Sequence, residues 1–526
     1  MLEKNIERAG TLQEHVEHNF IGMIKKHDKK LTISMLGGYN VRKFDTNVQE
    51  LKYKVLREIA RLAKDDKLAA GIPGIPETIV PGPVATMRCC IYKERAIVNE
   101  RIKMALGGHE DVPGEVEVLP IACDECPVSE ITVSDACRGC IAHRCANACP
   151  KGAISFINKG MHTQAHIDHS KCITCGKCVA ACPYSAITKN VRPCERACKP
   201  GAIKMDENRK AHINYEKCVS CGACVYQCPF GAIVDKSYIT KVIDLLKASR
   251  QEGGAPVYAV VAPSIYGQFS DVTTGQVVSG LKALGFCTVI EAALGADLVA
   301  YFEAKELVEK GFLTTSCCPA FVSYIKKNFP KLEQHISHNL SPMAMVAKVI
   351  KRAHPDSKIV FIGPCVAKKG EQKQERVRDL VDVVITFEEL QALMDAYEID
   401  MSVLEDDVLN NASYYGRVFA RSGGVRDAVE EVLRELEIKP EQFHLKPLAC
   451  SGLEECKLAL LKASKGILEE NFIEGMACEQ GCIGGPGCLT HGPKEKAMVD
   501  KYGRLALEKK VKDAVVIFDV LGGAEE

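Results

Sequence analysis

Cysteine is the residue type whose number and spacing in this sequence point most directly to chemistry. The chain holds 27 cysteines in 526 residues, and most of them fall in clusters that contain C-x2-C pairs. Clusters of this kind serve metal or redox chemistry in a reducing compartment more often than they form disulfides. A disulfide-rich secreted protein is the alternative, but residues 1–7 lack the charged-then-apolar pattern of a secretory signal. The sequence therefore predicts a cytoplasmic metalloprotein.

Two cysteine motifs share the spacing C-x2-C-x2-C-x3-C-P, and they begin at Cys172 and Cys218. In bacterial ferredoxins this spacing places three thiolates around one [4Fe-4S] cubane, while the fourth cysteine reaches the neighbouring cluster. Zinc is the alternative, but a closed tetrahedron does not account for the tail that ends in proline. A third motif begins at Cys137 and has a longer inner loop, C-x2-C-x4-C-x3-C-P. We therefore expect tandem ferredoxin-like domains of the α+β class.

Pairing these motifs distributes most of the cysteines over three clusters. The expected ligand sets are Cys137, Cys140, Cys145 with Cys182; Cys172, Cys175, Cys178 with Cys149; and Cys218, Cys221, Cys224 with Cys198. Cys194 and Cys228 belong to none of these sets and supply only two of the four ligands that a cubane needs. The upstream pair Cys123 and Cys126 could supply the other two and so complete a fourth cubane. Those two cysteines could instead be buried thiols or a separate site. The sequence thus predicts three or four clusters.

An internal repeat positions these cysteines. Cys149, Cys182, Cys198 and Cys228 each lead through a turn to an Ala-Ile pair, the expected start of a strand or helix. Ahead of the repeat, Cys89 and Cys90 are expected to be buried. Residues 71–76 and 81–83 are rich in glycine and proline, which predicts irregular linker.

After Asp235 the pattern changes to helices that alternate with apolar runs typical of buried parallel strands. The expected strands are 257–262, 289–291, 359–362, 381–385 and 515–518, and the expected helices are 12–26, 92–106, 238–249, 276–284 and 297–310. We expect an N-terminal region of unknown role over 1–120 that is partly helical. Tandem ferredoxin-like domains are expected over 121–236, and an α/β domain over 237–526.

Three short segments of the C-terminal half carry further cysteines: 315–321, 363–371 and 474–487. Taken singly each is weak evidence, because adjacent cysteines are usually packed thiols, and Lys368 with Glu371 is usually an i,i+3 surface pair. In this order, behind ferredoxin motifs, the segments resemble those of the [FeFe]-hydrogenase family, and the resemblance covers roughly residues 121–526. In that family the segments surround the H-cluster, a cubane joined to a two-iron unit that carries CO, cyanide and a bridging dithiolate.

The resemblance implies a role for each of these residues. The cubane would be held by Cys318, Cys365, Cys478 and Cys482, and Cys482 would bridge to the two-iron unit. Cys317 would be the terminal proton donor, Met476 would pack near the bridging carbonyl, and Lys368 would hydrogen-bond an iron-bound cyanide. Glu371 is expected at the same site beside Lys368. The family's proton relay from thiol to solvent maps onto Cys317, Glu303, Ser337 and Glu306. The alternative for Glu303 and Glu306 is a solvated helix face.

The resemblance also implies the reaction and its partners. The expected reaction is reversible oxidation of H2 to protons, with electrons relayed through [4Fe-4S] clusters to or from ferredoxin or flavodoxin. Hydrogenase maturation proteins would supply the two-iron unit. An iron–sulfur cluster assembly or redox-sensing relative without hydrogen turnover is the alternative, which Cys317, Lys368 and Glu371 disfavour. The equal numbers of basic and acidic residues, 68 of each, predict no nucleic-acid partner, and the absence of a long apolar run predicts no membrane span.

Some positions depart from the family's better-known pattern and resemble a less-studied clostridial branch: Ala320, Phe321, Met343, Gly363 and 485–488. Groups around a metal site tune its potential, so these departures leave catalytic bias and oxygen tolerance open. Four further cysteines are expected to be structural: Cys287, Cys450, Cys456 and Cys488.

Overall fold

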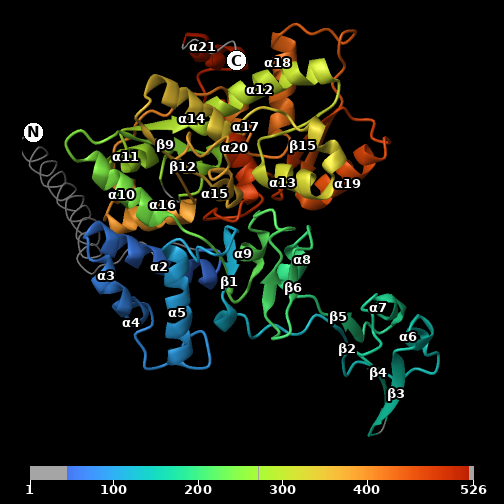
Figure 1. Ribbon diagram of the computed structural model, residues 1–526. Coiled ribbons are helices and arrows are strands. Elements are labelled where there is room, and N and C mark those ends of the chain that lie inside the picture. The colour runs from blue at the N-terminus through green and yellow to red at the C-terminus, as the bar shows by residue number, and fades with distance from the viewer. Residues whose placement is uncertain (1–43, 161, 270–271, 521–526) are drawn as a thin grey trace, which may run out of the picture. The chain divides into compact units, whose positions relative to one another are not determined.

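The computed structural model describes residues 44–160, 162–269 and 272–520 (Figure 1). The chain divides into two compact units, Met1–Asp45 and Thr46–Glu526, and every helix and strand named below belongs to the second unit. The helix predicted over 12–26 lies outside the described residues. Within the described ranges, no helix combines the length and apolarity that a membrane crossing needs.

The first part of the second unit is helical. It contains α2 (Asn47–Lys64), α3 (Leu68–Gly71), η1 (Ile72–Gly74), α4 (Ile75–Ile79) and α5 (Ile91–Ala105). The irregular linker predicted over 71–76 is wrong, because Pro73 and Pro76 stand in the first turns of short helices, where a missing N–H costs nothing. The prediction that Cys89 and Cys90 are buried is also wrong. Both are exposed, because they lie at the solvent-facing start of α5, where Cys90 is the N-cap.

Residues 116–235 contain one arrangement of strands and helices twice. Two strand pairs and two short helices make up each copy. The first copy comprises β2 (Ile131–Val133), α6 (Arg144–Asn147), β3 (Ile154–Lys159), β4 (His162–Ile167), α7 (Lys177–Ala181) and β5 (Ile187–Lys189). The second comprises β1 (Val116–Val118), α8 (Pro193–Ala197), β6 (Ile203–Met205), β7 (Ala211–Ile213), α9 (Ala223–Gln227) and β8 (Ile233–Asp235). In the first copy β2 pairs with β5 and β3 with β4, and in the second β1 pairs with β8 and β6 with β7, all antiparallel.

The second copy encloses the first along the chain, because β1 precedes β2 and α8 follows β5. We call residues 131–189 the inner copy and residues 116–130 with 190–235 the outer copy. The Ala-Ile pair of each repeated tail starts a strand, at Ile154, Ile187, Ile203 and Ile233, as the repeat predicted. A short turn, η2 (Pro120–Ala122), follows β1.

The C-terminal half is built on two parallel sheets flanked by helices. The strands are β9 (Val257–Val261), β10 (Thr288–Glu291), β11 (Leu313–Thr314), β12 (Lys358–Ile362), β13 (Val383–Ile385), β14 (Pro447–Ser451) and β15 (Phe472–Met476). The four-stranded sheet has the order β10-β9-β12-β13, and the three-stranded sheet has the order β11-β15-β14. The strands predicted over 257–262, 289–291, 359–362 and 381–385 are thereby confirmed.

Helices and short turns connect these strands. They are α10 (Ile239–Ser249), η3 (Pro263–Ile265), α11 (Thr274–Leu284), α12 (Ala292–Lys310), α13 (Pro319–Asn328), η4 (Pro330–His335), α14 (Pro342–Ala353), α15 (Ala367–Glu371), α16 (Phe387–Ala396), η5 (Met401–Val403), α17 (Tyr414–Val418), α18 (Gly424–Glu435), α19 (Leu453–Ser464), η6 (Cys482–Gly484), α20 (Glu495–Arg504) and α21 (Val511–Val520). The helices predicted over 92–106, 238–249, 276–284 and 297–310 are confirmed. The strand predicted over 515–518 is wrong, since these residues belong to α21.

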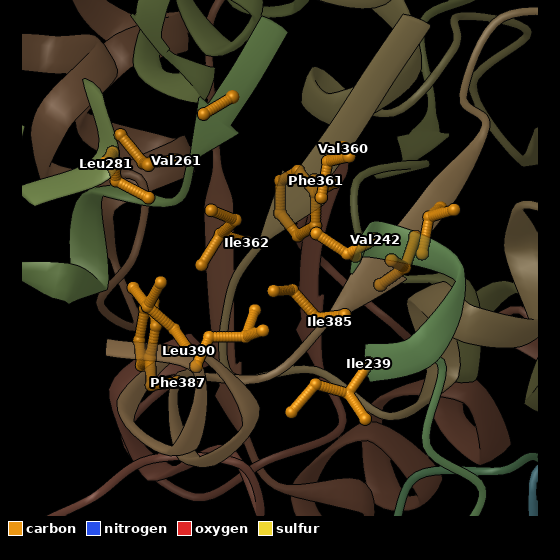
Figure 2. Packing of buried hydrophobic residues seen from close by; sticks show 14 of the residues in the cluster. Ile239, Val242, Val261, Leu281, Val360, Phe361, Ile362, Ile385, Phe387 and Leu390 are labelled. Atoms are coloured by element: carbon orange, nitrogen blue, oxygen red, sulfur yellow. The ribbon is translucent and has the colours of Figure 1, made fainter. Parts of the chain in front are cut away.

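The largest core lies around the four-stranded sheet. Figure 2 shows Val360, Phe361 and Ile362 of β12 between residues of α10, α11 and α16. Helix α2 packs against α16, α10 and α5, and so joins the N-terminal helices to this core. Because the apolar strands are buried, their carboxyl ends are held rigidly, and the cysteine segments follow these ends.

Candidate active site and cluster ligands

Three parallel strands lead into the three cysteine segments of the C-terminal half. Parallel strands gather ligand sites at their carboxyl ends. The cysteines that follow these ends are Cys317 and Cys318 after β11, Cys365 after β12, and Cys478 and Cys482 after β15.

Four of these cysteines lie close enough to influence one another's ionisation. Burial raises the pKa of Cys478 well above its usual value, and Cys365, Cys318 and Cys482 add to the rise. Burial, then Cys365 and Cys318, raises the pKa of Cys482 to about 12. The four thiols therefore lie near one another. As free thiolates they would repel one another there, which suits them to a centre of positively charged iron.

The donor set fits a cubane rather than one ion. Over the ranges that the structure describes, no three His, Cys, Asp or Glu side chains converge as ligands of a single metal ion. A zinc site would need its sulfurs about 2.3 Å from one centre. A [4Fe-4S] cubane is held by four thiolates, each on a different iron, and Cys318, Cys365, Cys478 and Cys482 provide that number and type of donor.

Glycines let the third segment pack tightly against its neighbours. Gly481 has a φ of +92°, and a Cβ there would come within 2.6 Å of the Ser422 nitrogen. A Cβ on Gly485 would come within 2.7 Å of the Pro364 carbonyl oxygen. Only glycine allows this backbone contact, which fixes Cys482 relative to the second segment.

Lys368 is a buried cation beside this cysteine group. Its ammonium donates to Glu371 Oε2 at 3.1 Å and to Ser341 Oγ at 3.3 Å. Burial lowers its pKa, but Glu371 and the neighbouring Cys365 more than offset this effect, so its pKa is raised and it stays charged. A buried lysine held in this way can donate a hydrogen bond to a further anionic group.

Cys317 lies in a packed apolar cluster with Met476, and both side chains are buried. After burial itself, Glu303 is the strongest electrostatic influence on the Cys317 thiol and raises its pKa. Glu303 projects from α12, is fully buried, and accepts hydrogen bonds from the backbone and hydroxyl of Ser316 at 3.0 and 3.2 Å. Burial raises the pKa of Glu303 to about 7.

The path from Glu303 continues toward solvent. The Ser337 hydroxyl lies near the Glu303 carboxyl and lowers its pKa, and it donates to Glu306 Oε2 at 3.0 Å. A bridge between Thr314 and Ile336 holds Ser337 beside the first cysteine segment. Glu306 in turn pairs with Lys310 at the surface, at 2.6 Å. The structure thus brings together the four residues expected in the relay, and they run from a buried thiol to an exposed ion pair.

In the inner copy, the cysteines divide into two groups. Burial raises the pKa of Cys145, with Cys140 and Cys182 adding to the rise. Burial raises the pKa of Cys178, with Cys172 and Cys149 adding to it. The backbone N–H groups of Ala165 and Ala153 donate to the sulfurs of Cys137 and Cys149, at 3.5 and 3.3 Å. Cys175 of the same motif is exposed. The grouping agrees with the expected ligand sets, which remain predictions.

In the outer copy, four cysteines line one hollow. Its lining includes Cys198, Cys218, Cys221 and Cys224. Backbone N–H groups donate to Cys198 Sγ at 3.1 Å and to Cys218 Sγ at 3.4 Å. Such bonds stabilise a thiolate. This is the third ligand set expected from the sequence.

The loop of this third set contacts the C-terminal segments. Cys221 influences the ionisation of Cys478, and a Cβ on Gly222 would overlap Pro486 at 2.5 Å. Lys327 of α13 donates to the Cys218 carbonyl oxygen at 2.6 Å. The outer copy therefore lies directly against the segments that carry Cys318, Cys365, Cys478 and Cys482.

The remaining cysteines are those of the possible fourth cubane and those expected to be structural. Cys123, Cys194 and Cys228 are buried in one cluster, with Cys126 half-buried beside them. The cysteines expected to be structural are buried at Cys450, Cys456 and Cys488, whereas Cys287 is exposed on the loop before β10.

Three charged residues near these sites could not be found from the sequence. Lys369 is fully buried and pairs with Asp235 at 3.0 Å and Glu389 at 2.8 Å, so it ties β8 to α15 and α16. Arg101 and Arg192 lie beside the outer-copy cysteines. A single basic residue carries no sequence pattern, and the contacts of these three span up to 134 positions along the chain.

Comparison with known proteins supports the cofactor chemistry. Residues 255–486 match a family model described as iron only hydrogenase large subunit, C-terminal domain. Residues 136–186 match a 4Fe-4S dicluster domain, and residues 171–231 match a 4Fe-4S double cluster binding domain.

Individual relatives agree with these models. The large subunit of a periplasmic [Fe] hydrogenase from Nitratidesulfovibrio vulgaris is 30% identical over 379 residues, which cover 61% of this chain and 85% of that protein. Iron hydrogenase 1 from Clostridium pasteurianum is 29% identical over 405 residues, covering 67% and 69%. Among solved structures, an apo [FeFe]-hydrogenase from Chlamydomonas reinhardtii matches with a TM-score of 0.46 at 20% identity, over 54% of this chain and 94% of that one.

Proposed function

This chain belongs to the iron-only hydrogenase family, and we propose that it catalyses the reversible reaction of H2 to two protons and two electrons. The chain carries an H-cluster and additional [4Fe-4S] clusters. When bound, the H-cluster supplies the redox chemistry at hydrogen, and the protein supplies position, exclusion of water and proton transfer.

The protein's own residues have separate tasks in this proposal. Cys318, Cys365, Cys478 and Cys482 would hold the cubane. Lys368 stays charged in a buried site through Glu371, and it can anchor an anionic cyanide ligand. Cys317 holds a proton beside the site, and Glu303 refills or receives that proton.

The observation that supports the proposal is the series of proton-bearing side chains from Cys317 through Glu303 and Ser337 to Glu306. Glu303 has a pKa of about 7, which suits a group that must gain and lose a proton near neutral pH. The Ser337 hydroxyl lies between the two carboxyls, and Glu306 meets solvent beside Lys310. A cluster carrier without turnover would have no use for such a line.

For the electrons, we infer a small acidic carrier such as ferredoxin or flavodoxin. The inner copy holds seven lysines and arginines against two aspartates over residues 131–189, and all seven basic side chains are exposed. A positive surface accelerates encounter with a negatively charged carrier. Ile141, Ile173 and Tyr184 are exposed there and offer apolar contact.

Infrared spectroscopy tests the proposal. The chain produced together with hydrogenase maturation proteins should show bands of iron-bound CO and cyanide and should evolve H2 from a reduced ferredoxin. The chain produced without those proteins should hold cubanes, lack the bands and be inactive. A matured chain without CO or cyanide bands would exclude hydrogen turnover and favour the assembly or electron-carrier alternative.

A further inference from the structure

The outer copy is a ferredoxin-like domain interrupted within its first cysteine motif. In the inner copy, one motif supplies Cys137, Cys140, Cys145 and Cys149 without a break between β2 and β3. In the outer copy, Cys123 and Cys126 follow β1, and the matching second half, Cys194-x3-Cys198, appears on α8 only after the whole inner copy. Position by position, Cys123, Cys126, Cys194 and Cys198 correspond to those four inner cysteines.

Hydrogen bonds support this correspondence. Ala165 of β4 donates its N–H to Cys137 Sγ at 3.5 Å, and Ala211 of β7 donates its N–H to Cys123 Sγ at 3.3 Å. Both alanines begin the same triplet, Ala-His-Ile, whose isoleucine pairs with the first residue of the preceding strand. Cys123 therefore has the place in the outer copy that Cys137 has in the inner one.

In the inner copy the tail cysteine of the second motif, Cys182, is the expected fourth ligand beside Cys137, Cys140 and Cys145. The corresponding four cysteines of the outer copy are Cys123, Cys126, Cys194 and Cys228, and they lie near one another. Cys123, Cys194 and Cys228 are buried in one packing cluster, which also holds Cys224 of the third ligand set. Arg192 contacts both Cys123 Sγ and the Cys126 carbonyl oxygen, which places Cys126 beside this cluster. In addition, the Ala232 N–H donates to Cys228 Sγ at 3.2 Å, as the Ala153 and Ala202 N–H groups do to Cys149 and Cys198. This cluster is distinct from the core around the four-stranded sheet.

Buried arginines accompany this group. Arg101 of α5 is 3% exposed and donates to the Gly231 carbonyl oxygen at 2.5 Å. Within the described part of the chain its Nε has no hydrogen-bond partner, and burial lowers the pKa of Arg101, an effect that the neighbouring Cys228 opposes. An unpaired buried guanidinium is costly, so a further anion is expected beside it.

Two more arginines approach the same cysteines. Arg192, 2% exposed, donates to the Cys126 carbonyl oxygen at 3.5 Å, and its NH1 lies 4.0 Å from Cys123 Sγ. Arg88 donates to the Ala122 carbonyl oxygen at 2.9 Å, next to Cys123, and also pairs with Asp124 at 3.5 Å. In the inner copy the helix cap that corresponds to Arg192 is His143, which stacks on Phe156 instead. A cubane with four thiolates is an anion, and it gains negative charge on reduction, so nearby guanidinium groups favour the reduced state.

We propose that Cys123, Cys126, Cys194 and Cys228 hold a fourth [4Fe-4S] cubane in the N-terminal half, and that Arg88, Arg101 and Arg192 make it the most readily reduced of the four. This cluster would be an electron store within the relay, a role that rests on the proposed function. The N-terminal helices then have a function, since Arg88 and Arg101 reach the cluster from that region.

Iron content tests the ligand set. The chain produced without maturation proteins should bind about 20 iron atoms, from five cubanes of four irons each. Cys194→Ala should lose about four of them, while Cys287→Ala, at an exposed cysteine, should lose none. Because Cys194→Ala could disturb folding, its far-ultraviolet circular dichroism and the electron paramagnetic resonance (EPR) signals of the other clusters should match those of the parent. About 16 iron atoms in the parent chain, or full iron content in Cys194→Ala, would overturn the assignment.

A redox titration followed by EPR tests the role of the arginines. In the parent chain, one N-terminal cluster should be reduced before the others. Arg101→Met should lower the equilibrium constant for its reduction by about tenfold, which is about 59 mV for one electron, and Arg101→Lys should restore most of that loss. Arg144→Met, at an exposed arginine of the inner copy, is the matched control and should leave this potential unchanged. An unchanged potential in Arg101→Met would refute the tuning role. Both tests use protein without the two-iron unit, so failure here leaves the hydrogenase proposal standing, and failure of that proposal leaves these results intact.

Discussion

Replacing Glu303 with glutamine should make the protein more stable and less active at the same time. Glu303 is fully buried on α12, and burial raises its pKa from 4.5 to about 7. At 1.36 kcal/mol for each pKa unit, burying the ionised carboxylate costs about 3 kcal/mol above pH 7. Glutamine keeps the shape and can still accept from Ser316, but it bears no charge.

The sign of the pH dependence follows from proton binding. Between pH 4.5 and 7 the folded protein holds the Glu303 proton after the unfolded chain has lost it. The free energy of unfolding therefore falls as pH rises through this window and stays lower above it. Glu303→Gln removes this contribution, so the variant should match the parent at pH 4.5 and exceed it by about 3 kcal/mol at pH 8. For the C-terminal α/β domain over residues 237–526, that difference is about 5 °C in melting temperature.

Activity should change in the opposite direction. A missing acid–base group costs about 10²- to 10⁴-fold in rate, so H2 evolution by Glu303→Gln should fall by at least about 100-fold with the infrared bands intact. Asp297→Asn is the matched control, because Asp297 lies on the same helix, is fully buried, and has its pKa raised to about 7 by burial. The Asp297 carboxyl accepts hydrogen bonds from the backbone and hydroxyl of Ser413, which is not a relay residue. The control should gain stability at pH 8 and keep its turnover within about twofold.

Two results would refute this reasoning. Near-normal turnover in Glu303→Gln would remove Glu303 from the proton path. An identical stability difference at pH 4.5 and pH 8 would show that the buried carboxyl does not titrate near pH 7.

Three further substitutions test neighbouring parts of the structure. Ser337→Ala should slow turnover by about tenfold, measured as H2 uptake, because the hydroxyl between the two carboxyls is lost. Lys368→Met leaves the buried Glu371 without its partner, and it should abolish or shift the cyanide bands while the cubane iron remains. Lys369→Met leaves Asp235 with Lys52 alone, and it should lower the free energy of unfolding by about 3 kcal/mol in a denaturant titration. Loss of the cyanide bands in Lys369→Met as well would show that these two lysines do not have separate roles.

The cysteine sites could be predicted because their geometry is local. A cubane loop needs its thiolates at short fixed intervals, so the spacing survives in the sequence and can be identified without a structure. The strands of the four-stranded sheet were equally accessible, because each is a short apolar run between turn residues. The same rule failed at 515–518, where an apolar run of four belongs to a helix, since such a run alone does not separate the two structures.

The features that the sequence did not reveal depend on contacts between distant residues. The interruption of the outer copy becomes visible through the pairing of β1 with β8, which lie more than 100 positions apart. The position of Arg101 beside Gly231 spans 130 positions. No local pattern records such contacts, because tertiary packing alone selects which buried charge meets which site.

The antiparallel pairing of β2 with β5 has a consequence for how this chain could change length. The strand pair brings the two ends of the inner copy together, and the Asn190 N–H donates to the Glu130 carbonyl oxygen at 2.8 Å. A segment that enters and leaves its host at one point adds little closure entropy, whatever its size. The outer copy can therefore gain, lose or exchange the inner copy without a change in its own strands. The number of clusters in the electron relay can then vary in evolution while the catalytic half stays constant.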